Sequence, residues 1–464
     1  MGITMDMAGL CNSLEYDSLP PEVVDRCKYL LLDYLGVAIR GTRSESSLPV
    51  YRYLARNQDQ KSAVPIPATS MKAEVSNVAL ALGVSAHSLE LDDVVNEASL
   101  HPAVSVISAA LPAGYLCKCR GQELIAAIVA GYEVMVKLGI ALDPAAHYQR
   151  GFHPTATCGT FGAAVASAKL FNINHKQTAD ALGIAGSQAA GSMEFLTDGA
   201  YTKRFHAGWS AHSGIIATQL AREGFTGPNT IIEGKFGFLH SYSSSSVPEK
   251  VLENWGAPYE VMNTSIKPHA CCRYKQGAID CIIKIMQENG LSAEIIKQIN
   301  ISILKAGFAL VAEPPEAKIN PASIVDAQFS MPFGAAVAVL HGAAFLDQYS
   351  MANINSAAIK DIMEKVTCLE NPLIEKDFPK KWPAHVEIIT KDKRTFDATL
   401  EHPKGDPENP LSWSEIIVKF RTLVAPILSS SQQDAIIDQV RDLENMPDLT
   451  RLMDTMTVDT FTRD

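Results

Sequence analysis

The sequence predicts a mainly α-helical protein that carries a smaller, inserted α+β domain. At 464 residues the chain exceeds what one hydrophobic core usually supports, so at least two domains are expected. Segments rich in Ala, Leu, Ile and Gly fill most of the first 266 residues, and alternating β-type runs follow them. Helical periodicity then returns near the C-terminus. We therefore predict a large helical domain from residues 1–266 and 404–464, with an α+β domain at 267–403.

The first strong helix follows Pro20 and ends at Gly41. Its apolar residues recur at helical spacing, which indicates a helix with one face in the core. Further segments of small and aliphatic residues suit closely packed, buried helices. These segments lie near residues 75–87, 102–117, 122–141, 158–171, 176–191 and 206–223.

The β-type signals are confined to the predicted inserted domain. A helix that ends at Gly290 leads into IKQINISIL, where Ile299, Ile301 and Ile303 alternate with polar residues. The stretch WPAHVEIITKDKRTFDATLEH contains two alternating runs around a polar KDKR turn, which predicts a hairpin. A helix is expected between these signals in FSMPFGAAVAVLHG. After them, PLSWSEIIVKFRTLVAPI and SSQQDAIIDQVRDLENM predict two more helices.

Composition excludes several classes of protein. A formal net charge of −11 argues against nucleic acid or an anionic membrane as a partner. The longest apolar region, which starts at Leu124, is interrupted by Glu133 and Lys137, so no membrane span is expected. The N-terminus lacks the pattern of a signal peptide, and nine scattered cysteines suit reduced thiols. These features favour a cytoplasmic protein.

The stretch SLELDDVVNEASLHPAVSV is unusually rich in titratable groups. Between two runs of small apolar residues it holds four carboxylates, and His101 follows them. The carboxylates are Glu90, Asp92, Asp93 and Glu97. A metal site, a solvated turn and an acid/base apparatus for a substrate are three possible explanations. The stretch lacks a calcium-loop pattern, and the chain has neither an H-E-x-x-H helix nor a paired C-x-x-C framework, so no metal is expected.

Motifs for nucleotide binding and serine hydrolysis are also missing. The chain has no G-x-x-x-x-G-K-[ST] sequence and no G-x-S-x-G elbow. The glycines of GIAGSQAAGS, from Gly183, follow neither the order nor the strand context of a dinucleotide site. Close packing between helices explains them better.

Basic residues gather in three short stretches with small or apolar neighbours. YTKRFHAG holds Lys203, Arg204 and His206, whereas IKPHACCRYK holds Lys267, His269, Arg273 and Lys275. In GFHPTATCGTFGAA, His153 stands where an apolar helix is expected to begin, and a helix N-terminus favours anions. A single buried His or Lys is more often structural. Three such stretches beside the acidic one make a shared site a better explanation than coincidence.

These motifs, in this order and at these intervals, resemble those of the MmgE/PrpD family. The resemblance rests on ELDD…LHPA, GFHPTATCGTFGAA, YTKRFHAG, IKPHACCRY, DAQFSMPFGAAVAVL and NPLSWSEIIVKF, and it covers nearly the whole chain. The family includes 2-methylcitrate dehydratases, cis-aconitate decarboxylases and iminodisuccinate epimerases. The resemblance implies a helical domain with an α+β lid domain, a homodimer, and no metal or organic cofactor.

Carried over residue by residue, the resemblance implies an active site formed by five side chains. They are Asp93, His101, His153, Lys203 and Lys267. The basic stretches themselves offer Arg204, His206, His269 and Arg273 as further candidates for binding substrate. A tyrosine of the family falls on Phe333 here, which removes a hydroxyl from the expected site. This difference argues against close equivalence to the aconitate decarboxylases.

The reactions of these relatives explain the residue types. Each creates negative charge on carbon beside a carboxylate, which requires nearby cations and a proton donor or acceptor. Lys203 and Lys267 would supply positive charge, and His101 and His153 would move protons, with Asp93 orienting one of them or acting as the base.

The sequence therefore predicts a cofactor-free lyase for a small di- or tricarboxylic acid. Dehydration of a 2-methylcitrate-like acid is placed first. Decarboxylation of cis-aconitate is second, because ELDDVVNEASLH is similar to the fungal decarboxylases. Epimerisation is third. A non-catalytic protein that binds carboxylates is the alternative from another class.

Overall fold

The computed structural model describes residues 2–56, 64–378 and 381–459 and divides the chain into two compact units. The first unit comprises Met1–Ser88, Asp92–Thr264 and Ser412–Asp464. The second comprises Leu89–Leu91 and Ser265–Leu411. The predicted fold class is confirmed, because the first unit is mostly helical and the second contains a four-stranded mixed sheet.

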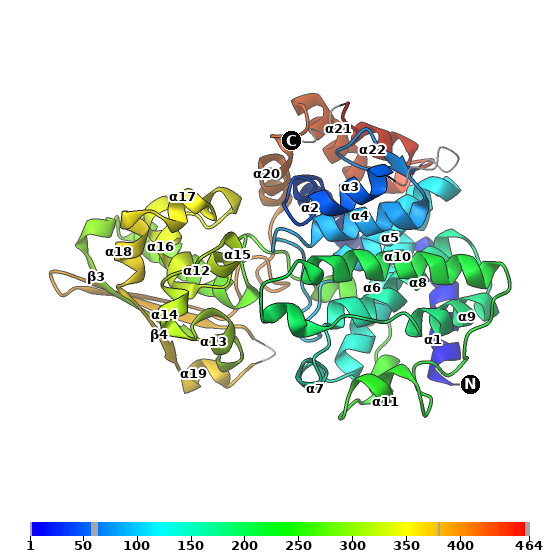
Figure 1. Cartoon of the computed structure of the whole chain (residues 1–464), viewed down its shortest axis with the longest axis horizontal. Helices are drawn as coiled ribbons and strands as arrows, with labels where there is room; N and C mark the ends of the chain where they lie inside the picture. Colours follow the sequence, from blue (N-terminus) through cyan, green and yellow to red (C-terminus); the bar gives the residue numbers. More distant parts are fainter. Residues whose placement is uncertain (1, 57–63, 379–380, 460–464) are drawn as a thin grey trace. The chain divides into compact units, whose positions relative to one another are not determined.

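The first unit is built from helices of both ends of the chain (Figure 1). Its N-terminal helices are α1 (Ile3–Ser13), α2 (Pro21–Gly41), α3 (Leu48–Arg56), α4 (Val75–Ala86), α5 (Ala103–Cys117), α6 (Gly121–Ala141), α7 (Pro144–Gln149), α8 (Pro154–Leu170), α9 (His175–Gly186), α10 (Thr202–Arg222) and α11 (Phe238–Tyr242). The C-terminal segment adds α20 (Trp413–Val424), α21 (Ser430–Arg441) and α22 (Thr450–Thr455). A short antiparallel pair, β1 (Val64–Pro65) and β2 (Lys72–Ala73), precedes α4.

Helix α6 is long and apolar enough to cross a membrane by length and composition. Its apolar window is nevertheless 94% buried inside the protein, which identifies α6 as a helix of the core. The interrupting polar residues are accommodated there: Lys137 pairs with Glu260 at 3.1 Å, and Glu133 accepts hydrogen bonds from two backbone N–H groups.

Small residues allow the central helices to approach closely. Helix α10 packs against α8 and α4, and α5 packs against α8 and α4 (Figure 1). A Cβ atom on Gly83 of α4 would lie 2.6 Å from the Cα atom of Gly208 on α10, so a side chain at that crossing would force the helices apart. The predicted role of small residues in close helix packing is confirmed at this crossing.

The second unit combines a sheet with short helices. The strand order is β4-β3-β5-β6, with β3 (Ile296–Ile303) parallel to β4 (Val366–Glu370) and antiparallel to β5 (Ala384–Thr390). The helices are α12 (Gln276–Glu288), α13 (Lys305–Val311), α14 (Pro315–Lys318), α15 (Ile324–Gln328), α16 (Met331–His341), α17 (Met351–Ile354), α18 (Ala357–Met363) and α19 (Pro372–Glu375). Helix α12 covers β5 and β6.

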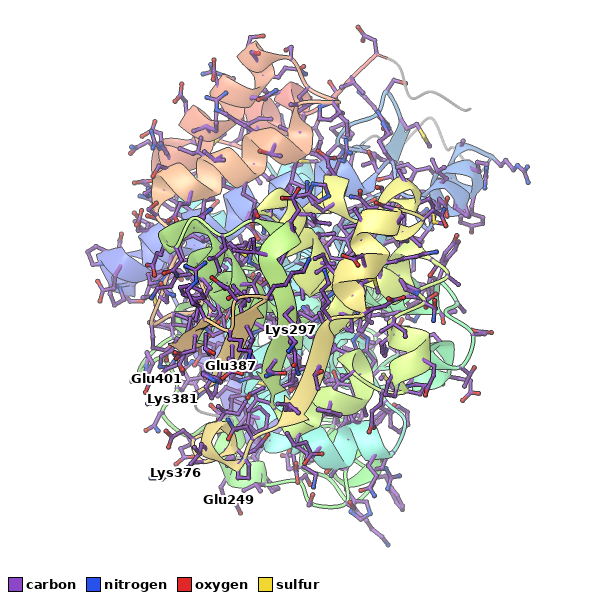
Figure 2. All side chains as sticks on the ribbon, turned by 90° about the vertical axis from the view of Figure 1, so that its left-hand side faces the viewer. Glu249, Lys297, Lys376, Lys381, Glu387 and Glu401 are labelled. Atoms are coloured by element: carbon purple, nitrogen blue, oxygen red, sulfur yellow. The ribbon has the colours of Figure 1, made fainter. Side chains whose placement is uncertain are left out.

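The predicted strand and hairpin are confirmed. Ile299, Ile301 and Ile303 are buried on β3, and β5 pairs antiparallel with β6 (Thr395–Leu400) around the KDKR turn. The opposite face of the sheet is polar, and Asn300 on β3 donates to Glu387 on β5 at 2.8 Å. Figure 2 shows Glu387, Lys297 and the ion pair of Lys381 with Glu401 at the surface of this unit. One buried face and one polar face are typical of an antiparallel sheet covered on one side.

Candidate active site

The loop between α4 and α5 carries the acidic stretch and provides the first part of the site. Its residues from Asp92 onward belong to the first unit, whereas Leu89–Leu91 belongs to the second. An isolated antiparallel bridge joins Val95 to Leu100, and this bridge brings His101 back beside the two aspartates. The four carboxylates are not equivalent, because Glu97 is exposed whereas the other three are buried.

Asp93 is buried among hydrogen-bond donors. Its carboxylate accepts a hydrogen bond from the hydroxyl of Tyr132 on α6 at 2.7 Å and from the N–H of Ala103 at 3.1 Å. Ala103 begins α5, and a helix N-terminus stabilises an acidic group. Burial nevertheless dominates and raises the pKa of Asp93 to about 7. The hydrogen bond from Tyr132 opposes this shift, and the charge of Asp92 adds to it.

His101 is held through its ring atom Nδ1 and its backbone. Nδ1 lies 2.5 Å from the backbone oxygen of Asp93 and 3.2 Å from Oδ2 of Asp92. The backbone N–H of His101 donates to Oγ1 of Thr155, in the first turn of α8, at 3.2 Å. The imidazole retains some exposure, with 14% of the side-chain surface accessible. His101 is therefore oriented by neighbours on both sides and still partly accessible.

His153 stands at the start of α8, as the sequence predicts. It occupies the N-cap position, and its N–H donates to the backbone oxygen of Gly191 at 2.9 Å. Its Nδ1 atom lies 3.2 Å from Nδ1 of His206 on α10, so the N–H of one ring donates a hydrogen bond to the other ring. Both imidazoles are buried.

The electrostatic environment keeps these two imidazoles neutral. Burial lowers the pKa of His153 well below its usual value, and the positive charges of nearby histidines and of Lys203 lower it further. Burial also lowers the pKa of His206 to about 4, with contributions from His87 and Lys203. A cation near an imidazole disfavours the protonated form of the ring. The charge of Lys203 therefore helps to keep both His153 and His206 neutral.

Lys203 and Arg204 lie in the first turn of α10. Arg204 is buried, and Lys203 is half-buried. The YTKRFHAG stretch is thus helical, and it brings a lysine, an arginine and His206 toward the start of α8. The structure of the first unit therefore gathers His101, His153, Lys203 and His206, together with Asp93, from three separate parts of the sequence.

Sequence reasoning missed His87, which also belongs to this cluster. His87 is the C-cap residue of α4 and is fully buried. Its ring stacks on His153 with centroids 5.7 Å apart and lies 5.2 Å from the ring of His101. Its Nδ1 atom is 2.7 Å from Oδ2 of Asp92. The only signal in the sequence is its position five residues before Asp92.

The remaining predicted site residues belong to the second unit. Lys267 is buried, and its Nζ atom donates to the backbone oxygen of Glu90 at 3.3 Å. His269 pairs with Asp280 at 2.9 Å, and Arg273 donates to both oxygens of Asp406 at 2.6 Å. The side chains of His269 and Arg273 thus already face carboxylates of their own unit.

Phe333 is fully buried in the first turn of α16. Its N–H donates to Oγ of Ser330, and its ring lies 5.5 Å from that of Tyr349. The buried ammonium of Lys275 donates to the Tyr349 hydroxyl at 3.2 Å and to the backbone oxygen of Ala327 at 2.9 Å. Burial lowers the pKa of Lys275 to about 8. Phe333 therefore places an apolar ring beside Tyr349, whose hydroxyl accepts the hydrogen bond from Lys275.

One group of side chains in the described part of the chain has the spacing of metal ligands. Ligand atoms of His402, Asp406 and Glu408 all lie within 4.8 Å of one another. Asp406 already accepts hydrogen bonds from Arg273 and from Ser265, so part of its capacity is used. None of the residues predicted to act on substrate belongs to this group.

Comparison with known proteins shows which family the chain belongs to. Residues 5–250 match the MmgE/PrpD N-terminal domain, and residues 269–445 match the MmgE/PrpD C-terminal domain. The chain belongs to the MmgE/PrpD family. The resemblance seen in the motifs is thus confirmed, and the protein is an enzyme of this family of lyases.

Curated relatives in this family align over almost their full length. A cis-aconitate decarboxylase-like protein, oryM, from Aspergillus oryzae is 26% identical, with 97% of this chain and 96% of the relative aligned. The cis-aconitate decarboxylase of Aspergillus terreus is also 26% identical, over 98% of this chain and 95% of its own. The mouse cis-aconitate decarboxylase is 26% identical over 97% and 93%. These relatives are named for a reaction on a small tricarboxylate.

Proposed function

We propose that this enzyme is a carboxy-lyase that removes CO2 from cis-aconitate or from a closely similar unsaturated tricarboxylic acid. The observation that carries the proposal is the cluster of His101, His153 and His206, in which the charge of Lys203 acts on His153 and His206. Relatives of the chain are named cis-aconitate decarboxylases. From the sequence alone, dehydration ranks first and decarboxylation second. The relatives favour the opposite order.

The reaction has two requirements that this cluster meets. Loss of CO2 breaks a carbon–carbon bond and leaves its electron pair on the carbon skeleton, where a neighbouring carboxylate spreads it as enolate-like charge. A proton then adds to carbon and gives an unsaturated dicarboxylate with one carbon atom fewer. The site must therefore stabilise negative charge and deliver one proton.

Lys203 and Arg204 are the proposed sources of positive charge in the first unit. A preorganised cation is most effective where burial limits competing water, and both side chains are at least half-buried. Lys267, which belongs to the second unit, remains a predicted source of positive charge. Because His269 and Arg273 already face Asp280 and Asp406, we propose that these two hold the second unit together.

His101 is the proposed proton donor. The lowered pKa values of His153 and His206 leave both rings neutral near pH 7, so neither carries a proton to spare for a carbanion. The ring of His101 instead lies 3.2 Å from Oδ2 of Asp92, and 14% of its side-chain surface is accessible. The neutral His153–His206 pair would orient substrate carboxylates through hydrogen bonds.

Asp93 is proposed to position His101. Its carboxylate is engaged by Tyr132 and by the start of α5, and its backbone oxygen accepts the Nδ1 proton of His101. Of the two roles predicted for Asp93, orientation fits these contacts better than proton abstraction does.

The test is a substrate panel. Purified protein is incubated with cis-aconitate, 2-methylcitrate and citrate, each with and without a chelator, and the products are identified by mass spectrometry. We expect CO2 and a dicarboxylate from cis-aconitate. Lys203→Ala is expected to lower kcat/KM by about 10²–10³-fold, as loss of one preorganised charge usually does. Lys297→Ala, which removes an exposed lysine from β3, is the matched control and is expected to leave the rate unchanged.

Other outcomes would redirect the assignment. Loss of water from 2-methylcitrate without CO2 release would support dehydration, the reaction that ranks first from the sequence alone. Saturable binding of all three acids without any product would favour the non-catalytic alternative. Activity that disappears with the chelator and returns with a divalent ion would contradict the prediction that no metal is needed.

A further inference from the structure

One carboxylate in the first unit is shared by two imidazoles. Oδ2 of Asp92 lies 2.7 Å from Nδ1 of His87 and 3.2 Å from Nδ1 of His101. The Asp92 side chain is only 2% exposed, and that of His87 is fully buried. A buried carboxylate is stable only when donors surround it, and here two ring nitrogens are placed to donate.

These contacts determine which ring nitrogen carries the proton. A carboxylate and a backbone carbonyl can only accept hydrogen bonds. Nδ1 of His101 faces the Asp92 carboxylate and the backbone oxygen of Asp93, so it must carry a hydrogen. In the neutral ring, the lone pair is then on Nε2. The same reasoning places a hydrogen on Nδ1 of His87.

His87 also connects this carboxylate to the other proposed rings. Its ring plane is within 22° of that of His153, with centroids 5.7 Å apart, and it lies 5.2 Å from the ring of His101. Its backbone N–H closes the end of α4 by donating to the oxygen of Gly83, the residue that touches Gly208 on α10. His87 is thus fixed by the same close helix crossing that brings α4 to α10.

We propose that Asp92 and His87 are positioning residues of the active site: Asp92 fixes the Nδ1–H forms of both rings, and His87 holds Asp92 in place for His101. This inference rests on the proposed function for its catalytic consequence only. For histidines that bind metals, the group that hydrogen-bonds the other ring nitrogen fixes orientation and tautomer, and its loss commonly costs about 10–100-fold in metal affinity or activity. We expect a contribution of about that size here.

The kinetic test uses matched substitutions. Asp92→Asn is expected to lower kcat about 10–100-fold with KM changed less than about threefold, because orientation rather than substrate binding is lost. Glu97→Gln makes the same acid-to-amide change at an exposed site of the same loop and is expected to behave as wild type. His87→Asn keeps a donor close to the position of Nδ1, whereas His87→Leu removes it. We expect His87→Asn to retain most of the activity and His87→Leu to match Asp92→Asn.

A spectroscopic measurement separates this inference from the proposed reaction. Nitrogen-15 NMR distinguishes a protonated ring nitrogen from an unprotonated one, with or without turnover. Neutral His87 and His101 are expected to show protonated Nδ1 atoms. Asn at position 92 can donate as well as accept, so His87 is expected to lose its single form in Asp92→Asn. If no acid is turned over, the NMR result still decides the inference.

Two results would overturn the inference. A hydrogen on Nε2 of neutral His101 in the wild-type protein would contradict the deduced form directly. Wild-type kcat in Asp92→Asn and unchanged His87 signals would show that the carboxylate fixes neither ring. Circular dichroism of each variant establishes that it is folded before these comparisons are made.

Discussion

Glu133 is a carboxylic acid in the middle of the most apolar helix of the protein. It is fully buried in α6, and its two oxygens accept the N–H groups of Gly256 and Glu260 at 2.9 Å each. Burial raises the pKa of Glu133 to about 7, and the two backbone hydrogen bonds reduce this shift. The folded protein therefore binds a proton at Glu133 more tightly than the unfolded chain does.

This shift predicts the direction in which the free energy of unfolding changes with pH. Because the folded pKa is raised from 4.5 to about 7, the contribution of Glu133 is fully present below pH 4.5 and is lost as the pH rises through 7. Relative to Glu133→Gln, the free energy of unfolding of the wild type should fall by about 3 kcal/mol across this window. Urea unfolding of both proteins at several pH values measures the difference. The prediction is contradicted if the free energy of unfolding of the wild type, minus that of Glu133→Gln, stays constant or rises as the pH rises.

Individual site residues could be predicted from the sequence only where a motif marked them. His101, His153, Lys203 and His206 stand in stretches of unusual composition, and the first unit gathers all four. His87 follows an apolar helix as a single histidine, a pattern more often found in ordinary cores. Its role depends on a contact with Asp92 and on stacking with His153, and spacing along the chain encodes neither.

At the scale of elements, the C-terminal helices are joined to the N-terminal ones by a buried ion pair. Lys419 on α20 lies 2.6 Å from Oδ1 of Asp33 on α2, and both side chains are less than a tenth exposed. Burial raises the pKa of Asp33, and Lys419 opposes that shift. Neither partner can be removed singly without leaving a buried charge unpaired.

Lys419→Ala is therefore expected to destabilise the protein by about 3–5 kcal/mol. Arg421→Ala removes an ion pair of similar length from the same helix, but Arg421 and Asp434 are 41% and 58% exposed, so its cost should be below about 1 kcal/mol. The double variant Asp33→Leu with Lys419→Met should be less destabilised than Lys419→Ala, because it leaves no unpaired charge. Thermal unfolding of the three variants tests this order. Equal costs for Lys419→Ala and Arg421→Ala would contradict the argument.

Elements were predictable wherever periodicity was strong. The predicted segment at 75–87 corresponds to α4 at Val75–Ala86, and the alternating isoleucines identified β3. The sequence could not give the pairing of β4 with β3, because the exposed strand VTCLE has little alternation. Short helices such as α14 and α17 also lack enough residues for a periodic signal.

At the scale of the whole molecule, the fold class followed from composition and the family from ordered motifs. The choice of reaction did not, because dehydration, decarboxylation and epimerisation all require cations and imidazoles near a carboxylate. The named relatives favour decarboxylation. The proposed cations are also divided between the units, with Lys203 in the first and Lys267 in the second. Cytoplasmic location and a homodimer remain predictions.

The central claim is that the enzyme replaces a carboxylate of cis-aconitate by a proton. Turnover in deuterium oxide with chelator present, followed by proton NMR, tests it most directly. We predict an unsaturated dicarboxylate that carries one deuterium at the carbon that gains the proton, and much slower formation by His101→Asn than by the wild type. Unchanged cis-aconitate with the folded wild-type protein, or a product that retains all three carboxylates, would contradict the claim.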